Sequence, residues 1–456
     1  MELRSHIFRQ YDIRGIVGDD LDDSVAEQVG KAYGSVLVER KGPAPHVSVG
    51  QDNRPSSPGL ASGLIRGLRS TGCRVSHIGT VPTPVTYWSE FELETDGCIM
   101  ITGSHNPAEY NGIKMTMGQA AMYGDAIIAL RDRIQAGDFV EGAEGELETL
   151  SLLPRYVDDI SGRFSLPRRV KVVVDCGNGT GSVVAVELLE SIGVEVVPLY
   201  CESDGTFPNH HPDPTVDEYV VDLIDTVRKT GAEVGIGFDG DADRLGAVDN
   251  EGNIIRGDVL LLLFGLDLLR RKGPGQTLVF DVKCSQVLPE EFEKAGGKAV
   301  MWKTGHSLIK EKMKETGAPL AGELSGHICF ADEYLGFDDA LYDACRLIDM
   351  IARSDRSLAE MAGDLPRFVS TPEIRIDVSE EIKFDLVRRA QEHFRREYDV
   401  IDVDGARVLF GDGWGLLRAS NTQPVIVARF EAKTEDRLRE IRDTMESWLR
   451  TQGVDV

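Results

Sequence analysis

The stretch Val170-Lys-Val-Val-Val-Asp175 and the glycine turn behind it, Gly177-Asn-Gly-Thr-Gly181, decide the fold class. The apolar run predicts a buried strand, the turn leads into a helix expected to end near Ile192, and residues 194–198 predict the next strand. A glycine turn of this kind could also bind a dinucleotide, but position 182 is Ser where that fingerprint has its third Gly. We therefore interpret the turn as a tight connection in a mostly parallel α/β sheet.

Two further stretches repeat this pattern, so the sequence predicts three tandem mixed α/β domains. Strand, helix and strand are expected at residues 47–50, 57–70 and 73–78, and again at 277–281, 286–295 and 298–302. The last quarter groups strands with two helices, which indicates a C-terminal α+β domain. Its strands are expected at residues 371–378, 400–409, 415–419 and 425–431, and its helices at 384–398 and 435–450. The predicted domains are residues 1–150, 151–253, 254–365 and 366–456.

The segment Thr102-Gly-Ser-His-Asn-Pro107 presents one hydroxyl, that of Ser104, after a predicted apolar strand at residues 98–101. A serine hydroxyl is a weak nucleophile and needs a neighbouring base or cation. His105 and Lys114 are both close in the sequence and offer such help. The alternative is a turn whose side chains only hydrogen-bond their own backbone.

The segment Asp239-Gly-Asp-Ala-Asp-Arg244 follows a predicted buried strand and carries three carboxylates at alternate positions. Mg²⁺ prefers oxygen ligands and keeps a position for a phosphate oxygen, which favours a magnesium site. A calcium loop of the EF-hand type fits poorly, because Arg244 stands where its glycine belongs and Asn250 where its closing glutamate belongs. The alternative is an acidic turn exposed to water.

The segment Arg418-Ala-Ser-Asn-Thr-Gln-Pro424, with Arg429 beyond it, lies between two predicted strands. Its guanidinium, hydroxyl and amide groups suit the oxygens of a phosphate. Ser-Asn-Thr clusters are also common in ordinary loops, which is the alternative for this segment taken alone.

These three segments and Gly322-Glu-Leu-Ser-Gly-His327 give the chain its resemblance to the α-D-phosphohexomutase superfamily, most closely to the bacterial phosphomannomutase/phosphoglucomutase group. The resemblance covers essentially the whole chain. It implies four domains around one central cleft, which carry in order a phosphoserine loop, a metal-binding loop, a sugar-binding loop and a phosphate-binding loop. One departure is Ala242, where many members have Gly; we expect little effect unless φ is positive there.

The resemblance implies an isomerase of carbohydrate metabolism that interconverts the 1-phosphate and 6-phosphate of mannose, glucose or both. Ser104 would carry a phosphoryl group, Mg²⁺ would be the metal, and hexose 1,6-bisphosphate would be intermediate and activator. The implied catalytic residues are Ser104, His105, Lys114 and Arg244, and the implied metal ligands are Ser104, Asp239, Asp241 and Asp243. The implied sugar-binding residues are Tyr11, Arg14, Lys283, Gly305, His306, Glu323, Ser325 and His327, and the phosphate-binding residues are Arg418, Ser420, Asn421, Thr422 and Arg429. The choice of general acid or base among His105, Lys114 and His327 stays open.

Two other functions share features with this sequence. Phosphoglucosamine mutases resemble the chain at residues 322–327, but they usually have Ala before the nucleophile and Ser-Gly-Thr-Glu-Pro in the phosphate loop. This chain has Gly103 and Ser420-Asn-Thr-Gln-Pro424, which favours the mannose and glucose group. A non-catalytic sugar-phosphate binding protein would have no need of Ser104 as a phosphorylatable nucleophile.

The composition of the 456 residues excludes several other classes of function. A net charge of −26 argues against nucleic acid as a partner. No apolar run is long enough to cross a bilayer, and the N-terminus lacks a secretory segment, so we expect no membrane partner. The seven cysteines are scattered, with Cys98, Cys176 and Cys345 expected in or near cores, which is typical of a cytoplasmic protein.

An anionic phosphosugar that approaches so acidic a protein needs a local excess of cations. The sequence offers candidates in Arg14, His105, Lys114, Arg244, Lys283, His306, His327, Arg418 and Arg429. The sequence does not predict an oligomeric state.

Overall fold

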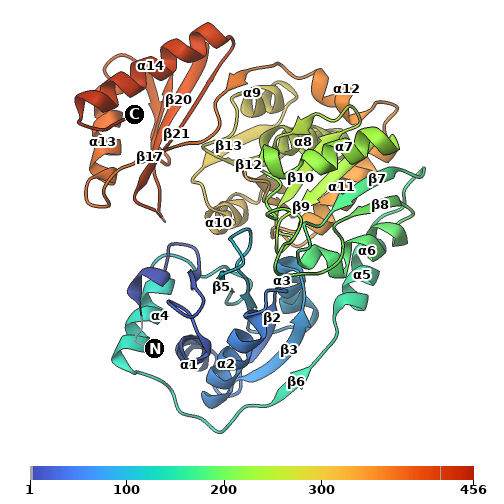
Figure 1. The fold of residues 1–456 in the computed structure, drawn as a ribbon, viewed down its shortest axis with the longest axis vertical. Helices are drawn as coiled ribbons and strands as arrows, with labels where there is room; N and C mark the ends of the chain where they lie inside the picture. Colours follow the sequence, from blue (N-terminus) through green and yellow to red (C-terminus); the bar gives the residue numbers. More distant parts are fainter. Residues whose placement is uncertain (1–3, 422) are drawn as a thin grey trace. The chain divides into compact units, whose positions relative to one another are not determined.

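The computed structural model describes residues 4–421 and 423–456 and contains two compact units, whose elements are drawn in Figure 1. The first unit comprises the residues up to Gly257 together with Ser325–Met361. The second unit comprises Asp258–Leu324 and Ala362–Val456. None of the helices in these described residues is long and apolar enough to span a bilayer.

The first sheet of unit 1 has the strand order β1-β5-β4-β2-β3-β6. Strand β5 runs antiparallel to β1 and β4, and the remaining pairs are parallel. Helices α1 and α2 approach each other closely, since a Cβ atom at Gly30 would lie 2.3 Å from the Leu64 carbonyl oxygen. The elements are η1 (Ser5–Ile7), β1 (Ile13–Ile16), α1 (Asp23–Lys41), β2 (His46–Gln51), α2 (Ser57–Ser70), β3 (Arg74–Thr80), α3 (Thr83–Glu92), β4 (Gly97–Ile101), β5 (Tyr110–Met115), α4 (Asp125–Ala136) and β6 (Leu147–Thr149).

The second sheet of unit 1 has the order β11-β10-β9-β7-β8, with β7 parallel to both of its neighbours. Strand β10 returns antiparallel to β9, and the acidic loop joins these two strands. The elements are α5 (Leu153–Ser161), β7 (Lys171–Asp175), η2 (Thr180–Val183), α6 (Ala185–Ser191), β8 (Glu195–Leu199), η3 (Asp217–Tyr219), α7 (Val221–Thr230), β9 (Val234–Phe238), β10 (Leu245–Asp249) and β11 (Ile254–Ile255). The returning segment of the unit adds β15 (Ile328–Phe330), α11 (Ala340–Ala352) and the start of α12 (Leu358–Gly363).

In unit 2, the parallel strands β13, β12 and β14 lie side by side in that order. The C-terminal sheet is antiparallel, with the order β16-β21-β20-β19-β18 and β17 also paired to β21. Helices α13 and α14 pack against it, and apolar side chains of both helices join its core. The elements are α8 (Gly257–Lys272), β12 (Thr277–Asp281), α9 (Val287–Lys294), β13 (Lys298–Trp302), α10 (His306–Thr316), β14 (Leu320–Gly322), β16 (Val369–Ser370), β17 (Ile374–Asp377), α13 (Lys383–Phe394), β18 (Asp399–Ile401), β19 (Ala406–Leu409), β20 (Gly413–Ala419), β21 (Val425–Ala432) and α14 (Glu435–Thr451).

The predicted fold class is confirmed, with mixed α/β sheets followed by a C-terminal α+β sheet. Three predicted elements are wrong in detail. The expected strand 400–409 is two strands, because Gly405 turns the chain with a φ of +112°. The expected strand 371–378 is the shorter β17, with β16 as a separate strand before it, and the helix expected up to Ile192 is η2 followed by α6. In the last case the N–H and hydroxyl of Thr180 donate to the Gly240 carbonyl, which fixes the start of the segment as a separate turn.

The predicted domain boundaries and the central cleft stay predictions. Cys98, Cys176 and Cys345 are buried, as expected.

Candidate active site

The serine loop follows β4, and its central residue, Ser104, has a left-handed backbone with a φ of +49°. A residue with a side chain pays about 1–3 kcal/mol for this conformation, so the surrounding structure has to hold it. The Ser104 N–H donates to Thr102 Oγ1 at 2.8 Å, and the side chain is almost fully buried. The loop therefore presents the Ser104 hydroxyl in one fixed orientation.

Two buried arginines hold the serine loop. Arg54 donates to the carbonyl oxygens of Ser104, Asn106 and Pro107, each at 2.7 Å, and pairs with Asp52 at 3.0 Å. Arg14 donates to the Gly103 carbonyl at 2.9 Å and to Asn106 Oδ1 at 2.7 Å. Sequence reasoning missed Arg54, because nothing local marks an arginine after β2 as the partner of a loop about fifty residues away.

The acidic loop packs directly on the serine loop. Asp239 Oδ2 lies 3.2 Å from Ser104 Oγ, and a Cβ atom at Gly240 would lie only 2.4 Å from the Ser104 carbonyl oxygen. Asp239 Oδ1 accepts the N–H groups of Asp243 and Arg244, both at 3.1 Å. One carboxylate thus shapes its own loop and reaches the serine hydroxyl.

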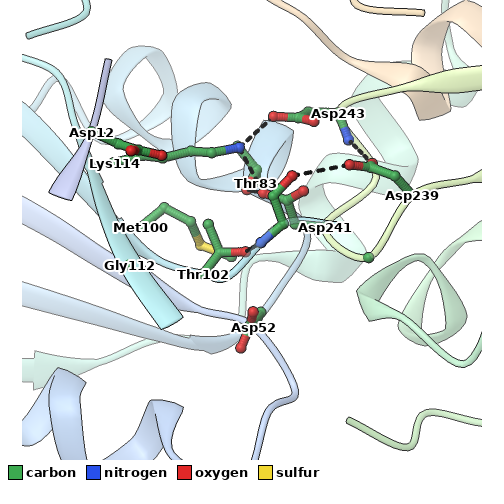
Figure 2. A network of polar contacts seen from close by, with 12 residues as sticks. Asp12, Asp52, Thr83, Met100, Thr102, Gly112, Lys114, Asp239, Asp241 and Asp243 are labelled. Carbon is green, nitrogen blue, oxygen red and sulfur yellow. Dashed lines mark hydrogen bonds and ion pairs between the residues drawn. The ribbon is translucent and has the colours of Figure 1, made fainter. Parts of the chain in front are cut away.

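Lys114, which extends from β5, lies between two carboxylates of the acidic loop. Its Nζ atom is 2.8 Å from Asp241 Oδ2 and 2.5 Å from Asp243 Oδ2, and Figure 2 shows the ammonium group directed at both. Asp241 Oδ2 also accepts a hydrogen bond from the Thr83 hydroxyl at 2.5 Å. Thr83, at the start of α3, is a second residue that sequence reasoning missed.

Burial and charge give the site groups different proton affinities. Burial and the adjacent Asp243 and Asp241 raise the pKa of Asp239 well above its usual value. Burial also opposes ionisation of Asp241, but Lys114 outweighs it and holds the pKa of Asp241 well below its usual range. Burial, Arg244 and Arg14 lower the pKa of His105 well below its usual value, so His105 is neutral at pH 7. Its Nδ1 atom lies 3.1 Å from Ser104 Oγ.

Arg244 connects the acidic loop to His327. Its Nε–H donates to His327 Nε2 at 3.0 Å, and the same Nε atom lies 3.9 Å from Asp239 Oδ2. Because Nε2 accepts this bond, the proton of a neutral His327 sits on Nδ1, which lies 3.0 Å from Asp338 Oδ2. Arg244 and His327 therefore form a fixed pair beside the three carboxylates.

The three carboxylates fit a hard divalent cation. Each of Asp239, Asp241 and Asp243 offers one oxygen, and these oxygens lie within 4.8 Å of one another. The buried Oδ1 atoms of Asp241 and Asp243 accept no hydrogen bond from the described residues. Buried carboxylate oxygens without donors are costly, which a cation would relieve.

Other predicted residues gather in unit 2. Glu323 is buried, and its Oε1 atom accepts the Gly305 N–H at 2.6 Å. Asp404 accepts the neighbouring Thr304 N–H at 3.0 Å and pairs with Arg418 at 2.6 Å. The sugar-binding and phosphate-binding segments predicted from the sequence are therefore linked through Asp404, which sequence reasoning missed.

Arg418 and Arg429 lie on the same face of the C-terminal sheet. Arg429 of β21 pairs in register with Leu416 of β20. Arg418 is two residues after Leu416 on β20, and residues two apart on a strand point to the same face of the sheet. Arg429 donates to the Lys283 carbonyl, and the Lys283 ammonium pairs with Glu373 at 2.6 Å. Burial would lower the pKa of Lys283, but Glu373, Asp281 and Glu323 raise it.

The remaining predicted residues are placed as follows. Ser325 is partly buried in unit 1, although Glu323 of the same motif belongs to unit 2. Tyr11 and His306 are partly buried, Ser420 is buried, and Asn421 is partly buried. Thr422 lies outside the described residues. Ala242 has a φ of +57°, so the condition under which its methyl group would matter is met.

Four family profiles match consecutive parts of the chain. They are the phosphoglucomutase/phosphomannomutase alpha/beta/alpha domains I, II and III, at residues 5–141, 154–252 and 256–368, and the C-terminal domain of the same family at residues 373–447.

Individual relatives match over nearly the full length. The chain is 47% identical over 449 residues to a phosphomannomutase/phosphoglucomutase of Pseudomonas aeruginosa, which covers 98% of this chain and 96% of the relative. It is 42% identical over 451 residues to a phosphoglucomutase of Neisseria gonorrhoeae, with 98% and 97% covered. A crystal structure of a phosphoglucomutase/phosphomannomutase family protein from Burkholderia thailandensis superposes with a TM-score of 0.91 at 42% identity, covering 98% of each chain.

Proposed function

Because the chain belongs to the phosphoglucomutase/phosphomannomutase family, we propose that it is a phosphohexomutase that interconverts hexose 1-phosphate and hexose 6-phosphate, with mannose and glucose as sugars. The observation that carries the proposal is the position of one buried hydroxyl. Ser104 Oγ lies 3.2 Å from Asp239 and 3.1 Å from a neutral His105, in a backbone conformation that costs free energy to maintain.

In the proposed cycle, Ser104 carries a phosphoryl group. The bond between Ser104 Oγ and phosphorus breaks as the free sugar hydroxyl forms a bond to the same phosphorus, and the hydroxyl proton passes to a base. The resulting hexose 1,6-bisphosphate turns around and returns its other phosphoryl group to Ser104. The net result is a hexose phosphate with its phosphoryl group moved between the 1- and 6-oxygens.

Asp239, Asp241 and Asp243 would hold Mg²⁺, which when bound would stabilise negative charge on the transferring phosphoryl oxygens. Arg244 would contribute further positive charge beside Asp239. The site residues differ in how they would handle the proton. Burial would lower the pKa of Lys114, but Asp241 and Asp243 raise it well above its usual value, so Lys114 stays protonated and does not accept the hydroxyl proton. Neutral His105 favours proton acceptance.

Unit 2 carries residues that suit a sugar and a phosphate. Glu323 would accept hydrogen bonds from sugar hydroxyls common to mannose and glucose, which differ only at the 2-hydroxyl. Arg418 and Arg429, on one face of the C-terminal sheet, would bind the phosphate that does not react. We place the protein in the cytoplasm, in keeping with its scattered free thiols.

A turnover assay tests this proposal. Glucose 1-phosphate, mannose 1-phosphate and glucosamine 1-phosphate are compared in the presence of Mg²⁺ and catalytic hexose 1,6-bisphosphate. We expect comparable turnover of the first two and clearly weaker turnover of the third. Ser104→Ala should abolish turnover and remove the phosphoryl group detected by peptide mapping, whereas Ser62→Ala, at an exposed position of α2, should change neither.

Each alternative has its own result in this assay. A preference for glucosamine 1-phosphate would identify a phosphoglucosamine mutase. Binding of phosphosugars without turnover of any of them would identify a non-catalytic binding protein.

A further inference from the structure

Two cysteines meet at the end of the second sheet of unit 1. Cys176 directly follows β7 and Cys201 lies two residues after β8, and their Sγ atoms are 3.3 Å apart. The two strands are parallel neighbours with Asp175 paired to Leu199. Neighbouring strands lie about 4.8 Å apart, which suits the Cα separation of about 4.4–6.8 Å found in disulfides. A bond between the two sulfurs therefore needs only a small local movement.

The backbone of β8 brings Cys201 to this position. A regular continuation of the register would place Tyr200 beside Cys176, but Tyr200 has a left-handed φ of +49°. This conformation breaks the alternation of side chains along the strand and turns Cys201 toward Cys176. The Asn178 N–H donates to the Tyr200 carbonyl at 2.9 Å and holds the two chain segments together.

We propose that Cys176 and Cys201 form a reversible disulfide when the protein meets a peroxide, and that this disulfide slows turnover by displacing the acidic loop. Cys201 is partly exposed and meets the oxidant, whereas buried Cys176 acts as the resolving thiol. The effect on turnover rests on the proposed function, but the disulfide itself does not.

The reaction consumes one hydrogen peroxide. The Cys201 thiolate attacks one peroxide oxygen and the O–O bond breaks, which leaves Cys201 as a sulfenic acid; the released hydroxide and the thiol proton form water. The Cys176 sulfur then attacks the Cys201 sulfur, the S–O bond breaks, and the leaving hydroxide takes the Cys176 proton as a second water. Both sulfurs are oxidised and the peroxide is reduced.

The electrostatic surroundings agree with these roles. The contact with Cys176 lowers the pKa of Cys201 despite its burial. The same contact and full burial raise the pKa of Cys176 well above its usual value. Cys201 is thus the thiol of the pair that ionises first, as the attacking residue requires.

The disulfide would lie next to the acidic loop. The turn that begins at Cys176 continues to Thr180, whose N–H and hydroxyl donate to the Gly240 carbonyl at 2.9 and 3.1 Å. Gly240 in turn packs on the Ser104 carbonyl. On the other side, Asn53 donates to the Asn178 carbonyl at 2.7 Å and to Ser203 Oγ at 3.0 Å. A movement of the Cys176 turn is therefore transmitted through direct contacts to both loops.

Peptide mass mapping of the full-length protein tests the disulfide. Residues 172–227 contain no Lys or Arg, so trypsin releases both cysteines in one peptide that ends at Arg228. After treatment with hydrogen peroxide and alkylation of the remaining thiols, we expect this peptide to be unalkylated at both cysteines and two hydrogen atoms lighter. Cleavage after Glu187 or Glu195 should then yield two fragments that only dithiothreitol separates. Two alkylated cysteines, or a sulfinic acid at Cys201, would overturn the proposal.

Turnover of the same samples tests the coupling. We expect about a tenfold fall after oxidation and recovery with dithiothreitol, because a displacement of about 1 Å costs a positioned group up to about 100-fold in rate. Cys201→Ser should have unchanged basal turnover and resist the peroxide. The control Cys73→Ala, at another buried cysteine, should respond as the unmodified protein does. A disulfide that leaves turnover unchanged would refute the coupling, and untreated protein that turns over no hexose phosphate would refute the proposed function instead.

Discussion

Lys114→Met is the substitution that tests the charge balance of the acidic loop most directly. Lys114 is buried and its ammonium group is the cation closest to Asp241 and Asp243, at 2.8 and 2.5 Å. Methionine keeps a similar length and apolar stem but removes the charge. Three buried carboxylates then remain within 4.8 Å of one another without the lysine.

The expected loss of stability follows from the burial of this cluster. Removing one partner from a buried ion pair costs about 3–5 kcal/mol, because the other partner is left uncompensated. A cooperative unit of this size changes its melting temperature by about 2–4 °C per kcal/mol, so unit 1 should melt about 6–20 °C lower in a chelator. The control Lys31→Met removes a more exposed pair with Glu27 and should cost less than about 1 kcal/mol.

Magnesium should reverse part of this loss. A cation present at about 100 times its dissociation constant stabilises the folded state by about 2.7 kcal/mol. In the natural protein Mg²⁺ would share Asp241 and Asp243 with the lysine, whereas in Lys114→Met it would not compete with that ammonium group. Scanning calorimetry in chelator and in saturating Mg²⁺ should therefore show a larger metal-induced shift for the variant. Equal shifts in both proteins, or a variant that melts with the natural protein in chelator, would refute this reasoning.

Three further substitutions have predicted outcomes. Gly240→Ala should lower turnover by about 100-fold, because its Cβ would lie 2.4 Å from the Ser104 carbonyl oxygen and must push the two loops apart by about 1 Å. The control is Ala242→Gly in the same loop, whose free energy of unfolding should stay within about 1 kcal/mol of the natural protein's. Burial raises the pKa of Asp339 to about 6, so the stability that this residue contributes is present below about pH 4 and lost by about pH 6. In denaturant titrations, the free energy of unfolding of the natural protein should fall by about 3 kcal/mol relative to Asp339→Asn over that interval, and a constant difference would contradict this. Glu323→Gln should lower turnover of glucose 1-phosphate and mannose 1-phosphate equally, by about 10–100-fold, because a charged hydrogen-bond acceptor is lost. An effect on one sugar alone would contradict a contact shared by both.

Local patterns predicted the parts of the site that lie within one stretch of chain. The three carboxylates of the acidic loop and the serine loop after β4 are predictable because each combines a buried strand with a characteristic turn. Lys114 was named only for its closeness in sequence to Ser104, and its most common environment would have been solvent. Its actual place is fixed by the antiparallel pairing of Met100 with Lys114, which brings β5 alongside β4.

Residues that act across the fold could not be found in this way. Arg54, Thr83 and Asp404 each satisfy a group more than a dozen residues away, and none belongs to a motif. The split of the expected strand 400–409 has a local signal in the sequence, because Asp404-Gly405 is a common turn dipeptide. Gly405 is required there twice, by its positive φ and by the Leu417 carbonyl oxygen 2.6 Å from where a Cβ would lie.

The structure also changes the explanation of how so acidic a protein would bind an anion. The sequence suggested a local excess of cations, but the buried cations hold carboxylate partners within their own unit. Lys114 pairs with Asp241 and Asp243, Lys283 with Glu373, and Arg418 with Asp404.

These pairs keep the cations buried and oriented in the absence of a ligand, since an unpaired buried charge would cost several kcal/mol. An incoming phosphate dianion would then replace a carboxylate at a cation already in position. Arg418, whose Nε–H donates to Asp404 Oδ2, is one such cation, and a phosphate would offer its guanidinium two oxygens. Binding would depend on this exchange of partners more than on the net charge of −26 spread over the surface, because surface charges beyond about 8–10 Å are screened at physiological salt.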